Sequence, residues 1–265
     1  MPRDTLRGKG GCTVGAQGRA KLAMGRGLSV WVLEAPDGFG DAGMHAHHAI
    51  QLTACLDGEL MITDGDTRVA ATGIAVAADA PHRFEAKGLI AFLFVEPESA
   101  AGRVITRQLF ADAPIAALPS GACGGALATL RTTFTDGLAA DDLLARGQAA
   151  LDHFAPDRHG PPTDPRVLKI IDHANANLDR PLTLAGESAR VFLSPSRLRH
   201  LFVEQTGLAF KTYVLWLRLT RALAAYAGGA NLTEAAHAAG FADSAHFSRT
   251  FKRTFGLPAN TLERL

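Results

Sequence analysis

Hydrophobic residues follow two different periods along the chain. Between residues 28 and 98 they form short apolar runs separated by turn signals such as Asp64-Gly65, a pattern typical of antiparallel strands. The runs that predict strands are Leu28–Leu33, His48–Leu56, Glu59–Thr63, Thr67–Ala71, Ile74–Ala77 and Leu89–Val95. Asp57-Gly58 stands between two of these runs and predicts another hairpin turn. This number of short strands indicates a β-barrel or a β-sandwich.

From residue 99 onward the apolar residues recur at spacings of three, four or seven, which predicts amphipathic helices. Residues 99–154 are expected to form two or three helices at a dimer or domain interface. Residues 155–165 are rich in Pro, Gly and charge and predict a linker. Residues 1–27, with many Gly, Lys and Arg and no apolar period, predict a flexible tail. We therefore expect a two-domain α+β protein, with a β-barrel over 28–98 and an all-α domain over 166–265, each burying its own core.

The last hundred residues contain a repeat with an offset of 49. The aligned pairs are Phe192 with Phe241, Leu198 with Phe247, Phe202 with Phe251, and Gly207 with Gly256. Each copy reads as a short Ala-rich helix, a tight connection and a longer helix with Ser194 or Asp243 as its N-cap. The repeat predicts two helix-turn-helix units, joined by a long spacer helix over residues 210–226.

The outward faces of the two longer helices are polar and basic. An α-helix fits the DNA major groove, where Arg reads base edges and Lys or Arg meets phosphates. Helices held about 34 Å apart would enter successive major grooves. The predicted DNA-contacting residues are Ser194, Ser196, Arg197, Arg199 and His200 in the first copy, and Ser244, Ala245, His246, Arg249, Lys252 and Arg253 in the second.

Three segments carry a family resemblance: LSPSRLRHLFVEQTG at 193–207, RLTRALAAY at 218–226, and TEAAHAAGFADSAHFSRTFKRTFG at 233–256. They resemble the AraC/XylS-type bacterial transcription regulators. The resemblance implies a double helix-turn-helix DNA-binding domain, with double-stranded DNA and RNA polymerase as partners and activation as its usual effect. It implies base contacts from the positions that match Ser196, Arg199, His200, Ser244, Ala245, His246 and Arg249.

Histidines cluster in the predicted barrel. His45 and His47 stand at alternate positions, so they share one face with Gln51 and with a cross-strand His82. Their order resembles the two motifs of cupin barrels, although cupins usually have Glu where Gln51 stands, and the P-x-G before the second His is missing. We expect these four residues to bind a small-molecule effector. A divalent metal is the alternative, and half-exposed strand histidines are a third; the missing carboxylate disfavours iron and manganese, and no cofactor is expected.

Charge distribution, cysteine count and the length of apolar stretches narrow the class of protein further. The chain has 27 basic and 26 acidic residues, but residues 164–265 carry a net charge of +5 and residues 1–163 a net charge of −4. Three cysteines without a CxxC pair fit a reducing compartment, and no apolar stretch is long enough for a membrane span. We expect a cytoplasmic, ligand-responsive transcription regulator, with a second copy of the chain as a candidate partner. The alternatives are a metal-dependent cupin enzyme with a DNA-binding appendage, and a barrel that serves only for dimerisation.

Overall fold

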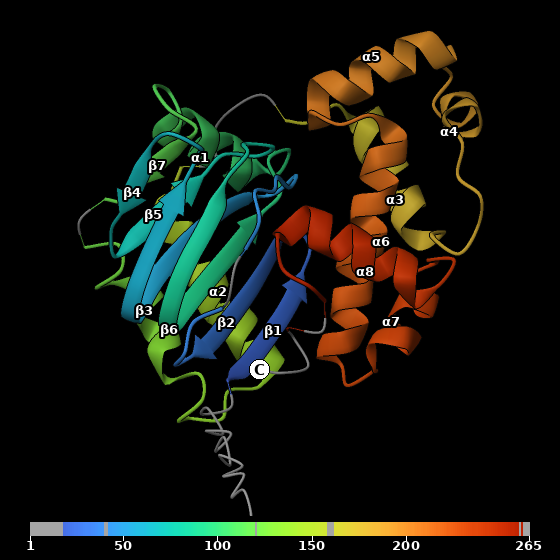
Figure 1. Cartoon of the computed structure of the whole chain (residues 1–265). Coiled ribbons are helices and arrows are strands. Elements are labelled where there is room, and N and C mark those ends of the chain that lie inside the picture. The colour runs from blue at the N-terminus through green and yellow to red at the C-terminus, as the bar shows by residue number, and fades with distance from the viewer. Residues whose placement is uncertain (1–17, 40–41, 120, 158–161, 260, 262–265) are drawn as a thin grey trace, which may run out of the picture.

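The computed structural model describes residues 18–39, 42–119, 121–157, 162–259 and 261. It consists of an antiparallel sheet followed by helices, as predicted, with helices packed on both sheet faces (Figure 1). The strands are β1 (Arg19–Gly25), β2 (Leu28–Ala35), β3 (Ile50–Thr63), β4 (Arg68–Ala70), β5 (Gly73–Val76), β6 (Arg83–Val95) and β7 (Ile115–Ala117). The helices are α1 (Ala100–Leu109), the 3₁₀ helix η1 (Ala126–Thr132), α2 (Ala140–Phe154), α3 (Pro165–Ala176), α4 (Leu184–Arg190), α5 (Pro195–Thr206), α6 (Phe210–Ala227), α7 (Leu232–Ala238) and α8 (Ser244–Phe255).

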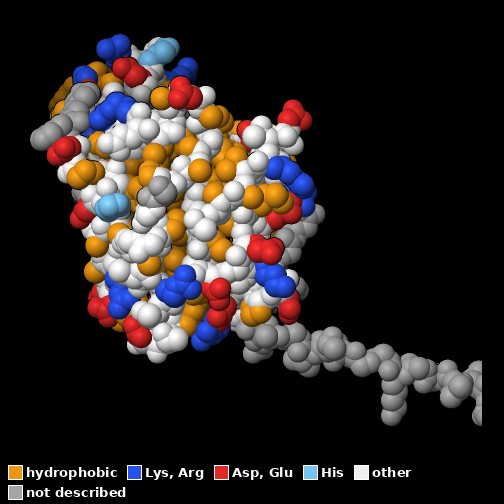
Figure 2. Space-filling view, turned by 90° about the vertical axis from the view of Figure 1, so that its left-hand side faces the viewer, with side chains coloured by type: hydrophobic (Ala, Val, Ile, Leu, Met, Phe, Trp, Pro, Cys, Tyr) orange, Lys and Arg blue, Asp and Glu red, His pale blue; other side chains and the backbone are white. Residues whose placement is uncertain are grey.

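The strands pair in the order β1-β2-β6-β3-β5-β7, and β4 pairs with β3 outside this path. Every pairing is antiparallel. The hydrogen-bonded path does not return from β7 to β1, so the predicted barrel is an open sheet. Seen from the side of β4 and β5, hydrophobic side chains gather near the middle of the face and charged side chains lie mostly around its rim (Figure 2).

The prediction of a flexible tail is wrong for residues 19–25, which form the edge strand β1. This strand pairs with β2 along its whole length, from Arg19 opposite Glu34 to Gly25 opposite Leu28. Ala20, Leu22 and Met24 alternate toward the apolar core of the sheet. The strand was missed because its apolar residues are few and follow a Gly-rich, basic stretch. Residues 1–17 lie outside the described residues.

Asp57-Gly58 is not the predicted hairpin turn but an irregularity within the single long strand β3. The register against β6 shifts between Cys55 and Asp57. Gly58 has φ +111°, and a Cβ there would lie 2.1 Å from the Lys87 carbonyl oxygen, so the close backbone approach requires glycine. The turn predicted at Asp64-Gly65 is confirmed, because the Asp64 amide donates to the Thr67 carbonyl at 3.2 Å.

The second half of β6, residues 90–95, is buried on both faces, as its continuous apolar run predicted. On one face Ile90, Phe92 and Phe94 belong to a core shared with α6, α7 and α8. On the other face Ala91 and Leu93 pack in a core with α1, η1 and α2. The sheet is therefore a middle layer between two sets of helices.

The second helix-turn-helix unit has no separate core, contrary to the prediction that each domain buries its own. Phe247, Phe251 and Phe255 of α8 belong to one apolar cluster with Trp31 and Phe94 of the sheet. The first unit does have its own core, built from α3, α5 and α6. The physical reason is a direct contact with the sheet: the Phe255 ring at the end of α8 lies 4.9 Å from the Trp31 ring and 5.7 Å from the Phe94 ring, between centroids.

The turn between α4 and α5 contains a strained residue that gives a stability prediction. Phe192 is 93% exposed and has φ +56°, whereas Gly240 has φ +82° in the matching turn of the second unit. A side chain in the left-handed region costs about 1–2 kcal/mol, partly offset by the greater freedom of glycine in the unfolded chain. Phe192→Gly is therefore expected to raise the free energy of unfolding by about 0.5–1 kcal/mol.

Urea unfolding measures this gain. Phe192→Ala is the matched control, because it removes the exposed ring but keeps the Cβ that causes the strain. Equal stabilities of the glycine and alanine variants would show that backbone strain at this turn is not the cause.

Candidate functional site

Helices α5 and α8 are the longer helices of the two predicted helix-turn-helix units, and their ends form as the sequence predicts. The side chains of Ser194 and Asp243 each accept a hydrogen bond from the backbone N–H three residues later. Gly207 and Gly256 end the helices with φ +77° and +74°, in the left-handed conformation that glycine favours. Asp164 caps α3 and Pro165 occupies its first turn, also as predicted.

The predicted DNA-contacting side chains lie at the surface of these helices. Ser244 and His246 are half-exposed. The exposed members of the set are Ser194, Ser196, Arg197, Arg199, His200, Ala245, Arg249, Lys252 and Arg253. Within the described parts of the chain, no carboxylate forms an ion pair with Arg199, Arg249 or Lys252. These cationic groups are therefore available to a phosphate or a base edge.

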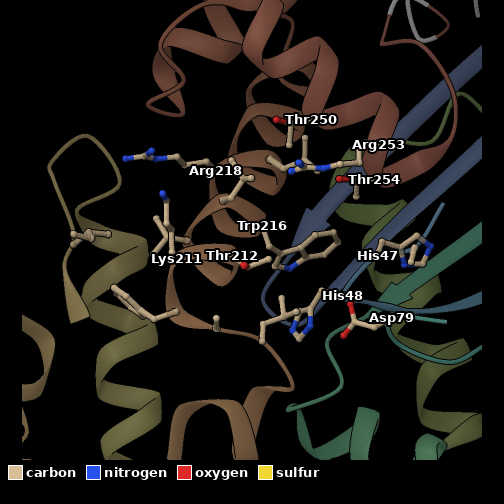
Figure 3. A pocket seen from close by; sticks show the side chains of 18 of the residues that line it. His47, His48, Asp79, Lys211, Thr212, Trp216, Arg218, Thr250, Arg253 and Thr254 are labelled. Atoms are coloured by element: carbon tan, nitrogen blue, oxygen red, sulfur yellow. The ribbon is translucent and has the colours of Figure 1, made fainter. Parts of the chain in front are cut away.

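A cleft of about 1280 Å³ lies between the sheet and the helical domain (Figure 3). Four side chains in its lining are cationic: Arg199, Lys211, Arg218 and Arg253. Asp79 is the one carboxylate among its described lining residues. The rest of the wall is largely apolar and includes Leu182, Leu184, Phe210, Val214, Leu215 and Trp216. The cleft thus combines an apolar wall with an excess of positive charge.

Both units of the helical domain contribute to this cleft, and so does the histidine-bearing loop. Arg199 comes from α5, His246 and Arg253 come from α8, and His45 and His47 come from the loop before β3. Helix α6 was predicted only as a spacer, yet it contributes Lys211, Trp216 and Arg218 to the cleft. No local pattern separates these residues from an ordinary amphipathic helix, because they meet the sheet only in the tertiary structure.

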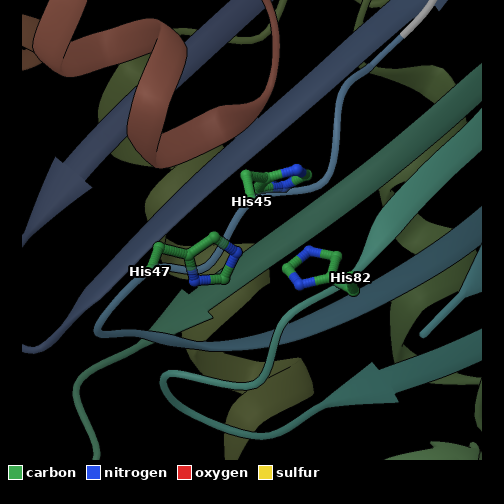
Figure 4. Close-up of side chains that lie close together, drawn as sticks. All are labelled: His45, His47 and His82. Atoms are coloured by element: carbon green, nitrogen blue, oxygen red, sulfur yellow. The ribbon is translucent and has the colours of Figure 1, made fainter. Parts of the chain in front are cut away.

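The predicted cluster of histidines forms. His45, His47 and His82 are buried, and one nitrogen from each lies within 4.8 Å of the others (Figure 4). The Nδ1 atom of each ring contacts a backbone carbonyl; these are Gly43, Ala49 and Ala80, at 2.8, 2.8 and 2.9 Å. A carbonyl only accepts, so each Nδ1 carries the proton and each Nε2 presents a lone pair. The buried His82 Nε2 has no hydrogen-bond partner among the described residues.

Gln51 completes the group, as predicted. Its Oε1 lies 3.0 Å from His47 Nε2, and its Nε2 donates to Thr53 Oγ1 at 2.8 Å. Because His47 Nδ1 already donates to a carbonyl, a neutral His47 faces Gln51 Oε1 with a lone pair. Burial lowers the pKa of His47 to about 4 and that of His82 to about 2, so both rings are neutral at neutral pH.

Three imidazole nitrogens and one amide oxygen suit a divalent transition metal of borderline hardness. Imidazole nitrogens suit zinc, copper, iron and nickel, whereas magnesium, calcium and manganese prefer carboxylate oxygens. Metal-bound histidines commonly donate their other ring N–H to a backbone carbonyl, as all three do here. The four residues could hold such an ion and would supply neutral ligands only.

The cavity beside the histidines is small. It has a volume of about 30 Å³ and is walled by Trp31, Phe94, Phe251, Phe255 and Leu257, among others. A water molecule needs about 10–15 Å³ by this kind of measure, so the space admits a water or an ion but not an organic metabolite. The residues predicted to bind an effector are therefore together. Helix α8 fills the space next to His45 and Gln51, whereas His45 and His47 also line the larger cleft.

A buried polar group links the sheet to α6. Glu98 accepts a hydrogen bond from the Tyr213 hydroxyl and lies 3.0 Å from His48 Nε2. Burial raises the pKa of Glu98, but the contacts with His48 and Tyr213 outweigh it and hold the pKa below its usual value. Tyr213 is 115 residues away in the sequence, so no local pattern indicated this contact.

Comparison with known proteins agrees with the geometry of the helical domain. A family model described as a helix-turn-helix domain matches residues 188–264. This part of the chain is therefore similar to helix-turn-helix domains. The HTH-type regulator YidL of Escherichia coli (strain K12) is 36% identical over 92 residues, and GlxA of Rhizobium meliloti (strain 1021) is 31% identical over 101. The alignments cover 34% and 38% of this chain and 31% of each relative, so the chain spans about a third of their length.

Solved structures resemble the whole architecture. ToxT from Vibrio cholerae O395 superposes with a TM-score of 0.55 over 91% of this chain and 99% of its own, at 12% identity. Unsaturated fatty acid-bound ToxT from Vibrio cholerae strain SCE256 gives a TM-score of 0.51 over 90% and 95% of the two chains, at 14% identity. At this identity the likeness concerns the fold alone: an antiparallel sheet region followed by a helical domain. In the described residues, no helix combines the length and the apolar character needed to cross a bilayer.

Proposed function

We propose that this protein is a sequence-specific DNA-binding transcription regulator that responds to a small molecule. The observation that carries the proposal is the pair of capped helices α5 and α8, each at the end of a helix-turn-helix unit. Each carries an exposed arginine, Arg199 or Arg249, that forms no ion pair with a carboxylate of the described residues. The match of residues 188–264 to a helix-turn-helix domain supports it, and so does the resemblance of the repeat to AraC/XylS-type regulators. We propose that Arg199 and Arg249 read bases and that Lys252 contacts phosphate.

We infer that the effector is an amphipathic organic anion held in the cleft of about 1280 Å³ between sheet and helices. Four cationic side chains and one carboxylate line the cleft, which favours a ligand with a negatively charged head group. The apolar wall of the cleft favours a hydrocarbon tail on the same ligand. The structure of ToxT with an unsaturated fatty acid bound supports the same chemical class. Because the cleft is lined by both α6 and the loop before β3, an occupant would favour one arrangement of sheet and helices, which is how it would change DNA affinity.

Binding of an unsaturated fatty acid, with oleate as the probe, tests the cleft. Lys211→Ala is expected to weaken oleate binding by about 10-fold or more, because a hydrogen bond to a charged group contributes about 1.5–3 kcal/mol. Quenching or enhancement of Trp216 emission during titration reports occupancy. Lys169→Ala, an exposed lysine of α3 that does not line the cleft, is the control. Equal affinities of all three proteins would remove the cleft as the effector site.

We propose no catalytic role for the sheet domain. Cupin enzymes usually hold their metal with a carboxylate as well as histidines, and Gln51 stands at that position here, so the anionic ligand of such a metal centre is missing. RNA polymerase and a second copy of this chain are further proposed partners, and the apolar centre of the face in Figure 2 supports the second. A regulator of this kind would act in the cytoplasm, where the DNA is.

A further inference from the structure

We propose that the effector carries a hydroxyl group on its hydrocarbon tail, in addition to its negative head group, and that His48 in the wall of the cleft binds this hydroxyl. The inference rests on the proposed effector site and specifies the chemistry of its ligand. Three observations carry it: a buried imidazole nitrogen without a partner, the carboxylates around that ring, and the position of the ring relative to the cationic side chains of the cleft.

The His48 ring is buried, yet it belongs to the lining of the cleft. Its side chain is 1% exposed. The Nδ1 atom is buried and has no hydrogen-bond partner among the described residues. A buried polar atom without a partner costs free energy, and most such atoms in folded proteins are hydrogen-bonded to protein or to ordered water. The partner of this nitrogen therefore has to come from the cleft, as a solvent molecule or as a group of the ligand.

The other nitrogen of the ring is already engaged. His48 Nε2 lies 3.0 Å from a carboxylate oxygen of Glu98, which also accepts a hydrogen bond from the Tyr213 hydroxyl. The pKa of Glu98 lies below its usual value, so this carboxylate is ionised at neutral pH and only accepts. His48 Nε2 therefore carries a proton and donates it to Glu98. This contact fixes the ring and leaves Nδ1 as the nitrogen that a ligand can bind.

A hydroxyl group matches Nδ1 better than other ligand groups do. A neutral ring presents a lone pair, to which a hydroxyl donates, and a protonated ring presents an N–H, from which a hydroxyl accepts. A methylene group satisfies neither form, so an unsubstituted tail that displaces water from Nδ1 loses affinity. A carboxylate would meet repulsion from Glu98 and from Asp79, which lies beside His48 in Figure 3. The four cationic side chains of the lining disfavour an ammonium group.

The cleft separates His48 from the position proposed for the head group. In Figure 3, Lys211 and Arg218 lie on one side of the Trp216 ring, and His48 and Asp79 lie on the other. A head group at Lys211 leaves the tail to run along Trp216 toward His48. The hydroxyl therefore stands on the tail away from the carboxylate, not on the neighbouring carbon.

The packing around His48 makes binding of the hydroxyl visible in tryptophan emission. The rings of Tyr213 and Trp216 lie against His48, with centroid distances of 5.3 and 5.8 Å. Tyr213 is held by its hydrogen bond to Glu98, whereas Trp216 lines the cleft. Because Nδ1 is covered in this conformation, the hydroxyl reaches it when the Trp216 ring moves. A hydroxylated ligand should therefore change the emission more than the same ligand without the hydroxyl.

Calorimetric titration of the full, unmodified chain tests the preference for a hydroxyl. It compares myristate with derivatives that carry one hydroxyl at different carbons of the tail. At least one derivative hydroxylated away from the carboxylate is expected to bind about 5-fold more tightly than myristate, the equivalent of about 1 kcal/mol for one hydrogen bond. This comparison needs no variant, so it does not depend on the folding of one.

Two variants separate recognition of the hydroxyl from recognition of the head group. His48→Gln keeps a side-chain N–H that can reach Glu98 but lacks the second ring nitrogen, so the preference for the hydroxylated ligand should disappear. Lys211→Ala should weaken binding of myristate and of its hydroxylated derivative by the same factor, and so keep the preference.

Two outcomes would overturn the proposal. Equal or weaker binding of every hydroxylated derivative would show that the cleft does not recognise a hydroxyl, and a wild-type preference in His48→Gln would exclude His48 as its partner. In both cases the binding of myristate itself would leave the proposed effector cleft standing. No binding of myristate, its derivatives or oleate would instead remove the cleft as the effector site, and this inference with it.

Discussion

Alanine at Arg199 or at Arg249 is expected to weaken specific DNA binding by about 5- to 150-fold, the equivalent of about 1–3 kcal/mol for a lost bidentate contact to guanine. Both side chains are exposed on capped helices, and no carboxylate of the described chain pairs with either. Affinity for non-specific DNA should change far less, because base contacts contribute little to it. Titration of specific and scrambled duplexes at one fixed salt concentration measures the difference.

Two other substitutions test whether charge alone explains the loss. Lys252→Ala should weaken specific and scrambled duplexes alike and reduce the salt dependence of binding, because a phosphate contact carries no sequence information. Arg166→Ala removes an exposed arginine of α3 that already pairs with Asp164 at 2.7 Å, and should leave both affinities unchanged. A loss in Arg199→Ala that is equal on both duplexes would make this residue a phosphate contact, contrary to the assignment.

Phe255→Ala is expected to lower the free energy of unfolding by about 3–5 kcal/mol, the usual cost of deleting a buried phenylalanine ring. Phe255 is 5% exposed, and its ring contacts those of Trp31, Phe94 and Phe251 at centroid distances of 4.9, 5.7 and 4.9 Å. The substitution would leave a cavity in the core that joins the second helix-turn-helix unit to the sheet.

Urea unfolding followed by tryptophan emission measures this effect, because both tryptophans lie close to Phe255. The emission of the folded variant should also shift. Phe202→Ala is the control: Phe202 is fully buried in the separate core of the first unit, so its loss should destabilise the chain without changing the folded emission. A cost below about 1 kcal/mol for Phe255→Ala would mean that α8 does not pack on the sheet in solution.

The helix-turn-helix units were predictable because their signals are local. Ser194 and Asp243 as N-caps, and Gly207 and Gly256 as terminators, each fix a helix end from a few neighbouring residues. The histidine group was predictable for the same reason, since the alternation of His45 and His47 places both on one side of the chain. Only the pairing with His82 depended on the sheet, and it forms through an isolated bridge to His45.

The docking of α8 on the sheet was not predictable from the same residues. Phe247, Phe251 and Phe255 were interpreted as the inner face of one helix-turn-helix unit, and periodicity cannot tell which of two apolar partners a stripe will contact. The cleft and the contact of Glu98 with Tyr213 depend on this docking and were missed with it. The edge strand β1 was missed because a strand with few apolar residues gains its stability from pairing with β2.

Selection of preferred sites from a library of randomised duplexes tests the central claim, that α5 and α8 read two adjacent turns of DNA. The wild-type chain should select two short elements whose centres are about 10 base pairs apart. Arg199→Ala should lose base preference in one element, and Arg249→Ala in the other. Identical preferences in the wild type and both variants, or loss at the same base pair in both, would contradict the account.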